Sequence, residues 1–384
     1  MKSTRLQYII EYDDNWRETL SSEPFNLRIR EDNRGRAIFS YSQISSDFRN
    51  PIVREARGII IDLWTNNVVC RAFDKFGNLG ENYAPSVDDI DWKRSKVMEK
   101  LDGSIIKLWV DPVRNTVQIS TNGAIYARQA EIGVLGDFHR LVEMAPEYDD
   151  VSDIVLRNPE HTHVFECTSP YNRIVVPYRE THLNYLSSRR NSDGYHEMID
   201  EFKDVAPVPK MYDFTSLEDA IAFTQSETFN DFRNEGFVVW TEDDRIGFHP
   251  IVKLKTQEYL RVHRLRGESV PTVKNIVPMI MDGEYEEFLA YFPEYQRQFT
   301  SIRNKIDLFI DDQWSDIQYA MDSFDERKDM ALWAKETMND MSVLFQIVDR
   351  KIEYSRNGVW RYYRDNPKHV ISYVSDFTDV LLPE

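Results

Sequence analysis

The chain has 384 residues and 41% hydrophobic content, which is sufficient for two or three domains with buried cores. Its 47 basic and 65 acidic residues give a formal net charge of −18, which argues against coating of nucleic acid through bulk charge but allows a local basic groove. No run resembles a membrane span, and no apolar leader follows Met1. A cytoplasmic protein without a membrane partner is therefore expected.

Strand patterns dominate the first two thirds of the chain. A hairpin is predicted over residues 59–73, around the turn Thr65-Asn66-Asn67. Further strands are predicted over residues 96–98, 105–110, 117–120, 162–167, 174–176, 183–186, 237–240 and 251–254. Cys70 and Cys167 lie inside apolar runs, so both are expected to be reduced core residues.

Helices interrupt these strands rather than alternate with them. They are predicted over residues 128–144 and, from a Ser216 cap, over residues 217–224. The pattern indicates an α+β fold with mostly antiparallel sheets in a first domain, residues 1–260.

Helical spacing replaces β-branched alternation after about residue 260. The apolar residues between Phe299 and Met321 fall on one helix face, and residues 332–348 predict a second strong helix. We expect an all-helical C-terminal domain over residues 261–384.

The segment Lys100-Leu101-Asp102-Gly103 places a lysine next to an acid-glycine turn. A primary amine there can attack the α-phosphate of a nucleotide once burial and nearby cations lower its pKa, because only the neutral amine is nucleophilic. Taken alone, these four residues are more typical of a solvent-facing turn. The interpretation depends on the segments downstream.

Three downstream segments carry the other groups that such chemistry needs, namely phosphate-binding cations and a carboxylate for a metal ion. Glu166 ends a predicted strand, Glu235 precedes another, and Lys253 and Lys255 alternate along a third, so both lysines share a face. The alternatives are a strand-end carboxylate paired with an arginine such as Arg173, and lysines that protect an edge strand.

Together these segments resemble motifs I, III, IV and V of the covalent nucleotidyltransferases, which include ligases and capping enzymes. The matching residues are Lys100-x-Asp102-Gly103, Phe165-Glu166, Glu235-Gly236 and Lys253-x-Lys255. The segments Ala56-Arg57-Gly58-Ile59-Ile60, Lys75-Phe76-Gly77-Asn78-Leu79 and Pro170-Tyr171-Asn172-Arg173-Ile174-Val175 resemble, more particularly, the T4 RNA ligase 1 family. This similarity extends over nearly the whole chain.

The resemblance implies an adenylyltransferase domain of ATP-grasp-like ligase fold that uses ATP and Mg²⁺ or Mn²⁺ to seal RNA ends. Lys100 would be the nucleophile, on a turn shaped by Asp102 and Gly103. Glu166 would contact the ribose, and Glu235 would hold the metal or its water.

The remaining matched residues would bind the nucleotide or its phosphates. Gly236, Lys253 and Lys255 belong to motifs IV and V, and Arg57 and Lys75 would act on the triphosphate or on the RNA 5′-phosphate. This collection of cations is expected to help keep the Lys100 amine neutral.

The implied partner is RNA with a 5′-phosphate and a 3′-hydroxyl end, with nicked tRNA as one candidate, prepared by an end-healing kinase/phosphatase. The helical domain would contribute RNA or tRNA specificity. A phage origin, which the resemblance implies, would place the protein in the host-cell cytoplasm.

One departure from the family pattern leaves rival functions open. Where close relatives carry a lysine, this chain reads Ser120-Thr121-Asn122-Gly123, so a phosphate-binding cation is missing or supplied elsewhere. An RNA-end-binding protein without turnover is one rival, and a capping-type guanylyltransferase or a DNA ligase is another.

Two basic segments are candidates for RNA contact. Residues 355–364 mix arginines with aromatic residues, and Arg261, His263, Arg264 and Arg266 form a second cluster. A packed helix with a basic rim is an equal alternative for the first. His161 and His163 have metal-compatible spacing but no accompanying Cys or His cluster, so a zinc site is not expected.

Overall fold

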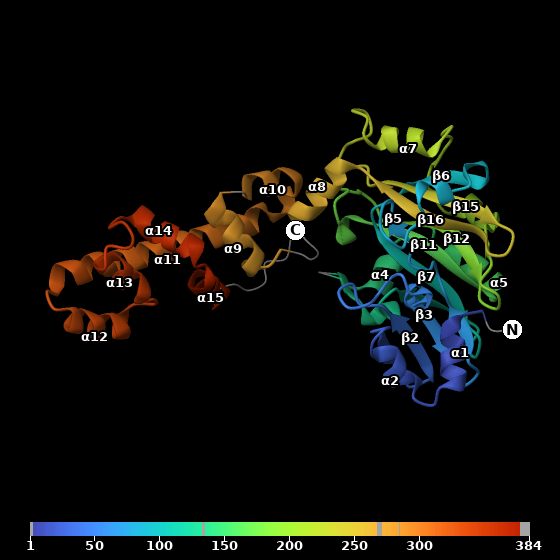
Figure 1. Ribbon diagram of the computed structural model, residues 1–384, viewed down its shortest axis with the longest axis horizontal. Helices are drawn as coiled ribbons and strands as arrows, with labels where there is room; N and C mark the ends of the chain where they lie inside the picture. The colour runs from blue at the N-terminus through green and yellow to red at the C-terminus, as the bar shows by residue number, and fades with distance from the viewer. Residues whose placement is uncertain (1–2, 133–134, 267–270, 284, 377–384) are drawn as a thin grey trace. The chain divides into compact units, whose positions relative to one another are not determined.

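The computed structural model describes residues 3–132, 135–266, 271–283 and 285–376 and separates into two compact units, Met1–His263 and Arg264–Glu384 (Figure 1). The first unit combines sheets and helices, whereas the described elements of the second unit are helices. The predicted α+β class with a helical C-terminal region is confirmed. None of the helices in the described ranges has the length and apolar character needed to cross a membrane.

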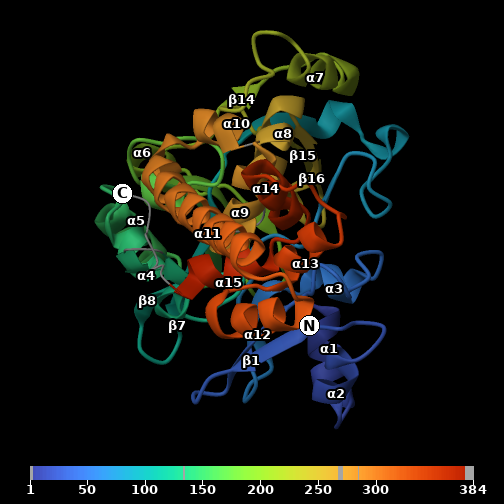
Figure 2. The ribbon, with the colours of Figure 1, turned by 90° about the vertical axis from the view of Figure 1, so that its left-hand side faces the viewer.

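A four-stranded antiparallel sheet forms the N-terminal part of the first unit. Its order is β1 (Arg28–Glu31), β2 (Arg36–Ser40), β3 (Arg57–Asp62) and β4 (Asn67–Cys70). The helices α1 (Arg5–Tyr12) and α2 (Trp16–Ser21) lie beside this sheet in both views (Figures 1 and 2), and α3 (Pro51–Glu55) precedes β3. The β3–β4 hairpin confirms the prediction over residues 59–73.

A larger sheet carries most of the predicted strands. Its order is β14 (Met211–Tyr212), β6 (Ser95–Lys100), β15 (Gly236–Asp243), β16 (Gly247–Lys255), β13 (His196–Glu197), β12 (His182–Arg190), β11 (His161–Thr168), β7 (Ser104–Asp111) and β8 (Thr116–Thr121), with β5 (Gly77–Asn78) beside β16. The β13–β16 and β16–β5 pairs are parallel, and the other described pairs are antiparallel. The predicted antiparallel character is thus confirmed.

Apolar side chains of β7, β11 and β12 form a core with α4 (Phe138–Glu143), α5 (Tyr148–Arg157) and α6 (Glu201–Val205). Another core joins β15 and β16 to α7 (Leu217–Thr224). The α7 bounds match the prediction, and the Ser216 hydroxyl caps the helix by accepting a hydrogen bond from the Asp219 amide at 3.1 Å. Both cysteines are buried and free.

The helix predicted over residues 128–144 is wrong in its first half. Its described part contains a short hairpin of β9 (Glu131–Ile132) and β10 (Gly136–Asp137), and the helix begins only at Phe138. Gly136 adopts a φ of +93°, which a continuous helix does not allow, and the Asp137 carboxylate caps α4 by accepting from the Arg140 amide.

The described part of the second unit is built around one long helix. Its elements are α9 (Val273–Asp282), α10 (Tyr285–Tyr291), α11 (Gln296–Ser323), α12 (Arg327–Thr337), α13 (Ser342–Val348), α14 (Arg356–Asp365) and α15 (Lys368–Asp376), and α8 (Gln257–Arg266) precedes them. The apolar stripe of α11, which includes Phe299, Ile302 and Ile306, is buried against α9, α14 and α15. The predicted helix face is confirmed.

The single helix predicted over residues 332–348 is two helices. Met338 is extended, with ψ of 142°, and ends α12. The Asp340 carboxylate then accepts a hydrogen bond from the Ser342 amide at 2.9 Å, which favours a new start for α13. A local side-chain hydrogen bond, rather than a helix cap, therefore accompanies the break in the continuous apolar spacing.

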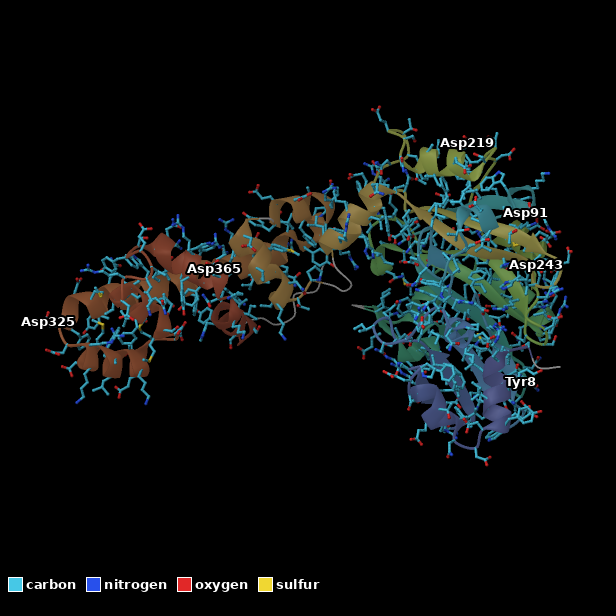
Figure 3. All side chains as sticks on the ribbon, in the orientation of Figure 1. Tyr8, Asp91, Asp219, Asp243, Asp325 and Asp365 are labelled. Atoms are coloured by element: carbon cyan, nitrogen blue, oxygen red, sulfur yellow. The ribbon has the colours of Figure 1, made fainter. Side chains whose placement is uncertain are left out.

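Several acidic side chains face solvent in both units. Asp91 and Asp219 of the first unit and Asp325 and Asp365 of the second are exposed and project from the ribbon (Figure 3). The negative net charge is therefore compatible with a basic site elsewhere in the chain.

Candidate active site

The register of β6, β15 and β16 brings the motif residues together (Figure 1). Lys100, at the end of β6, lies opposite Gly236 of β15, and Gly236 lies opposite Lys255 of β16. Lys253 lies two residues earlier on the same strand, so it shares the face of Lys255. Residues far apart in the sequence thus form one row across three neighbouring strands.

Glu235 lies between the two lysines at the ends of this row. Its Oε2 atom is 2.7 Å from the Nζ atom of Lys100, and its Oε1 atom is 2.9 Å from the Nζ atom of Lys255. The carboxylate is only 4% exposed, against 19% and 20% for the two lysine side chains. Burial favours the neutral acid, but the two ammonium groups outweigh it and hold the pKa of Glu235 below its ordinary value.

The prediction that neighbouring cations keep the Lys100 amine neutral is wrong. Burial favours the neutral amine, but the carboxylates of Glu235, Glu166 and Asp102 outweigh it and raise the pKa of Lys100 above its ordinary value. The lysine is therefore held as an ammonium ion, and its attack on phosphorus requires relief of these interactions.

Lys253 shows the depressed pKa that was expected of Lys100. Burial and the positive charges of Arg57, Lys100, Lys75 and Lys255 lower the pKa of its amine to about 6. These five residues are the cations selected from the sequence, and in the structure the other four lie close enough to Lys253 to lower its pKa. An arriving anion would favour the charged form of Lys253.

Phe76 separates two of these cations. The Lys253 Nζ atom lies 4.7 Å, and the Arg57 guanidinium carbon 5.3 Å, from the centre of its ring. Lys75, next to Phe76 in the chain, places its Nζ atom 5.1 Å from the Tyr41 ring and 4.7 Å from the Phe48 ring. Aromatic faces thus hold the cations close together without neutralising them.

The Asp102 carboxylate fixes the loop that follows Lys100 by hydrogen bonds to two other segments. Its Oδ1 atom accepts a hydrogen bond from the Tyr259 hydroxyl at 2.7 Å, and its Oδ2 atom accepts from the amides of Val175 and Val176, both at 2.7 Å. The strand predicted over residues 174–176 is therefore wrong, because these amides bind a side chain rather than a neighbouring strand. Tyr178 completes the support, since its hydroxyl accepts from the Asp102 amide.

Gly103 and Glu166 are in direct contact. The Gly103 amide donates to the Oε1 atom of Glu166 at 3.1 Å, and a side chain on Gly103 would overlap the carbonyl oxygen of Cys167. Burial raises the pKa of Glu166 to about 7, against the lowering effect of Lys100. This carboxyl group is therefore able to hold or release a proton near neutral pH.

Gly236 allows the central strand to pass close to its neighbour. Its φ of +136° disfavours other residues, and a side chain would overlap the carbonyl oxygen of Leu254. The glycine of the predicted Glu235-Gly236 pair is thus required by the backbone that sets Glu235 between its lysines.

A cleft of about 320 Å³, termed the Lys100 cleft, opens beside this row. Its apolar lining includes Phe73, Met98, Leu186, Val238 and Trp240, and its charged lining includes Arg57, Lys100, Glu166 and Lys253. An apolar wall facing cations suits a ligand with a planar base and phosphates.

Two residues that line this cleft each carry a buried polar atom without a hydrogen-bond partner in the described structure. They are the Nε1 atom of Trp240 and the Oδ1 atom of Asn122. Buried polar groups are seldom left unpaired. Asn122 belongs to the segment Ser120-Thr121-Asn122-Gly123, in which the lysine expected from the family pattern is missing, and Lys107 donates to the Gly58 carbonyl oxygen.

The described residues contain no group of three or more His, Cys, Asp or Glu side chains placed to hold a metal ion. Glu235 is available to a metal only if it gives up a lysine contact. The donor set still fits Mg²⁺ or Mn²⁺, because Mg²⁺ usually binds one or two carboxylates together with substrate phosphates. His163 contacts Ser188 and the Asn158 carbonyl oxygen.

The arginines of α14 are engaged with acidic side chains. Arg356 pairs with Asp307 and Asp311, and Arg364 with Asp365. Tyr363 is buried, with its hydroxyl 2.9 Å from the Oε1 atom of Gln313. These contacts favour the packed helix with a basic rim over an RNA-stacking surface. In the second basic cluster, Arg261 pairs with Glu258 at 3.1 Å.

Several residues of this site were missed in the sequence. Phe76 and Asn122 lay in segments that were singled out, but Tyr259, Tyr178 and Trp240 carried no signal. Only the fold shows that their side chains reach Asp102 or the cleft.

Comparison with known proteins assigns the chain to a family. The model of the RNA ligase family matches residues 55–259, which is more than half of the chain and includes every motif residue of the site. The chain belongs to the RNA ligase family. This result confirms the resemblance to the T4 RNA ligase 1 family.

Individual relatives agree with this family assignment. The chain is 31% identical over 272 residues to a protein of Autographa californica nuclear polyhedrosis virus named "Putative bifunctional polynucleotide kinase/RNA ligase", covering 67% of this chain and 37% of the relative. It is 23% identical to RNA ligase 1 of bacteriophage TS2126, covering 55% and 54%. The chain thus spans about half or less of the length of these relatives.

An archaeal ATP-dependent RNA ligase is among the similar solved structures. It has 14% sequence identity and a TM-score of 0.45, with 64% of this chain and 62% of that chain covered.

Proposed function

We propose that this chain is an ATP-dependent RNA ligase that joins a 3′-hydroxyl end to a 5′-phosphate end. The observation that carries the proposal is the Lys100 amine, held in a row with Glu235 and Lys255 beside a cleft that also contains Arg57 and Lys253. Membership of the RNA ligase family supports the same activity.

In the first step, the Nζ atom of Lys100 forms a bond to the α-phosphorus of ATP, and the bond to pyrophosphate breaks. The amine must be neutral to attack, so the Lys100 ammonium group releases a proton to solvent as its interaction with Glu235 is relieved. Arg57, Lys75, Lys253 and Lys255 neutralise the phosphates, because phosphoryl transfer depends mainly on positioning and charge stabilisation. Glu166 contacts the ribose, and Asp102, Gly103 and Gly236 set the backbone of the site.

In the second step, an oxygen of the RNA 5′-phosphate attacks the lysyl-AMP phosphorus, and the lysine leaves with a proton. In the third step, the 3′-hydroxyl oxygen attacks the 5′-phosphorus of the adenylated end and a phosphodiester forms. The phosphoanhydride bond to AMP breaks, AMP departs, and the hydroxyl proton is released to solvent. Mg²⁺ or Mn²⁺, held by Glu235 and the phosphates, would supply positive charge during these transfers.

The parts of the chain divide the work in this proposal. Residues 1–260 carry nucleotidyl transfer, and residues 261–384 contribute to the choice of RNA, for which nicked tRNA is one candidate. An end-healing kinase/phosphatase would supply the required 5′-phosphate and 3′-hydroxyl ends. The name of the viral relative, which includes a kinase, supports such a partnership.

The test is incubation of the full chain with labelled ATP, GTP or NAD, followed by denaturing electrophoresis. We expect a labelled polypeptide from ATP and circularisation of a 5′-phosphorylated RNA. Label from GTP alone would indicate a capping-type enzyme, and sealing of DNA but not RNA would indicate a DNA ligase. RNA binding without an adduct would indicate an end-binding protein. Each of these results would overturn the proposal.

A further inference from the structure

A second pocket meets the Lys100 cleft at two shared side chains. This pocket, termed the Arg28 pocket, has a volume of about 340 Å³ and is lined in part by Arg28, Arg30, Tyr41 and Gln43. Arg57 and Asn122 line both the pocket and the cleft. A ligand whose end lies at Lys100 can therefore continue past Arg57 into the Arg28 pocket.

The fold builds one wall of this pocket from the loop after β8. The Arg30 guanidinium donates to the Gly123 carbonyl oxygen at 2.9 Å, and the Ser40 hydroxyl donates to the Asn122 carbonyl oxygen at 3.0 Å. Gly58, with a φ of +76°, lets β3 lie against the Asn122 backbone, where a side chain would clash. The small sheet and this loop are thus fixed as two sides of one hollow.

The pocket differs in charge from the chain as a whole. It contains three arginines, and none of the described residues that line it is acidic, although the chain carries a net charge of −18. Arg28 and Arg30 are two residues apart on β1, so their side chains leave the same face of the strand. Guanidinium groups in such an arrangement suit phosphate oxygens, which they bind through paired N–H donors.

The other lining groups indicate more than a simple phosphate site. Tyr41 adds an aromatic ring to the lining, with the Lys75 Nζ atom 5.1 Å from its centre, and the exposed Gln43 amide offers a donor and an acceptor. This combination of arginine, aromatic ring and amide is typical of single-stranded RNA recognition. The triphosphate of ATP needs cations rather than an aromatic ring or an amide. Lys253 and Lys255 already supply such cations near Lys100.

We infer that the Arg28 pocket binds the phosphodiester backbone of single-stranded RNA next to the end that is being joined. This inference rests on the proposed RNA ligase function and assigns a position to its substrate. The Arg28 guanidinium contacts phosphate, and Tyr41 and Gln43 contact the adjoining nucleotide. Arg57 and Asn122 mark the passage between the RNA strand and the Lys100 cleft.

The test measures binding of a 5′-phosphorylated, 3′-blocked RNA oligonucleotide to the full chain by fluorescence anisotropy over a range of KCl concentrations. For Arg28→Ala we expect about fivefold weaker binding, the size of a solvent-accessible ion pair. The slope of log Kd against log[KCl] is expected to fall by about 0.7, as for loss of one phosphate contact on a single strand. An oligonucleotide with a 5′-hydroxyl end, tested in parallel, tells which of the two RNA strands occupies the pocket.

Two further variants test whether weaker RNA binding comes from the pocket rather than from a loss of folding or of any exposed arginine. Gln43→Glu adds a negative charge at an exposed position of the pocket and is expected to weaken RNA binding without a loss of folding, measured by thermal melting. Arg157→Ala removes an equally exposed arginine from α5, which does not line the pocket, and is expected to leave RNA binding unchanged.

Adenylation separates this inference from the proposed function. If the wild-type chain forms no AMP adduct, the proposed function fails, whereas the pocket is still judged by the anisotropy series. If Arg28→Ala and Gln43→Glu bind RNA as the wild type does, the inference is overturned while the ligase proposal stands. A higher KM for ATP in the adenylation of Arg28→Ala, with unchanged RNA binding, would assign the pocket to the triphosphate and also overturn it.

Discussion

The hydroxyl oxygen of Tyr259 lies 2.7 Å from the Oδ1 atom of Asp102, so the first turn of α8 is tied to the loop that follows Lys100. The other carboxylate oxygen of Asp102 holds the amides of Val175 and Val176. Asp102 therefore joins three separate segments of the chain and fixes the loop that follows Lys100.

Replacement of Tyr259 by phenylalanine tests this positioning. We expect the free energy of unfolding to fall by about 1 kcal/mol, because one buried hydrogen bond is lost. The rate of lysyl-AMP formation should fall at saturating ATP, with little change in KM. Urea denaturation and single-turnover adenylation measure the two effects. Tyr8→Phe, at an exposed position (Figure 3), is the control, and an equal effect there would refute the role of Tyr259.

Replacement of Lys100 by alanine is expected to abolish the covalent AMP adduct completely. The fold should persist, since Glu235 keeps its ion pair with Lys255. Mass spectrometry of the intact chain after incubation with ATP measures the adduct, and circular dichroism checks folding. Lys93→Ala removes an exposed lysine from the same unit and should leave the adduct intact. An adduct on Lys100→Ala would show that another residue is the nucleophile.

Replacement of Glu235 by glutamine leaves two lysines without their shared carboxylate. We expect a loss of about 1–3 kcal/mol in the free energy of unfolding, the range for buried hydrogen bonds to charged groups. The matched change Glu31→Gln breaks an exposed pair with Arg17 and should cost less than about 1 kcal/mol. Urea denaturation at pH 7 compares both variants with the wild type. Equal losses of unfolding free energy in the two variants would show that burial of Glu235 does not strengthen its contribution to stability.

Binding of ATP should be accompanied by uptake of a proton at Lys253. The free amine has a pKa of about 6, and contact with phosphate raises this value, so between the two pKa values binding takes up as much as one proton. Affinity should accordingly increase as the pH falls from 8 towards 6. Titration calorimetry in buffers of different ionisation enthalpy measures this uptake. In Lys253→Arg, which stays charged, the Lys253 contribution should vanish, and an unchanged uptake would exclude Lys253 as its source.

Replacement of Gly236 by alanine should disrupt the row of site residues. A side chain there meets the Leu254 carbonyl oxygen at an unfavourable φ, so we expect a loss of at least about 2 kcal/mol in the free energy of unfolding. Gly123→Ala is the matched control, because nothing lies within 4 Å of the added carbon. Thermal melting compares the two variants, and an equal melting temperature for both would contradict the predicted overlap at Gly236.

Local patterns in the sequence predicted the pieces of the site but not their assembly. The common face of Lys253 and Lys255 follows from strand alternation alone. The contact of Lys100 with Glu235 joins residues 135 positions apart, and its register depends on the whole sheet. For this reason the predicted sign of the Lys100 pKa shift was wrong, since two of the three carboxylates that raise the pKa, Glu235 and Glu166, come from distant segments.

The secondary-structure errors have a similar physical origin. Apolar spacing over residues 128–144 and 332–348 fitted a helix, but Gly136 and Asp340 introduce local breaks that spacing does not reveal. The residues at 174–176 have strand-forming character, yet their amides bind the Asp102 carboxylate. The predicted roles of the motif residues, and of the two domains, remain predictions for the experiments above.

The row of Lys100, Gly236 and Lys255 has a consequence for biosynthesis. Lys100, Gly236 and Lys255 are added to the growing chain at widely separated times. The Lys100 amine therefore lacks the Glu235 carboxylate and the neighbouring lysines until the last of the three strands has paired. A slip of one position in that pairing would turn each side chain to the opposite face. In the proposed ligase, adenylation of Lys100 therefore requires that all three strands have paired.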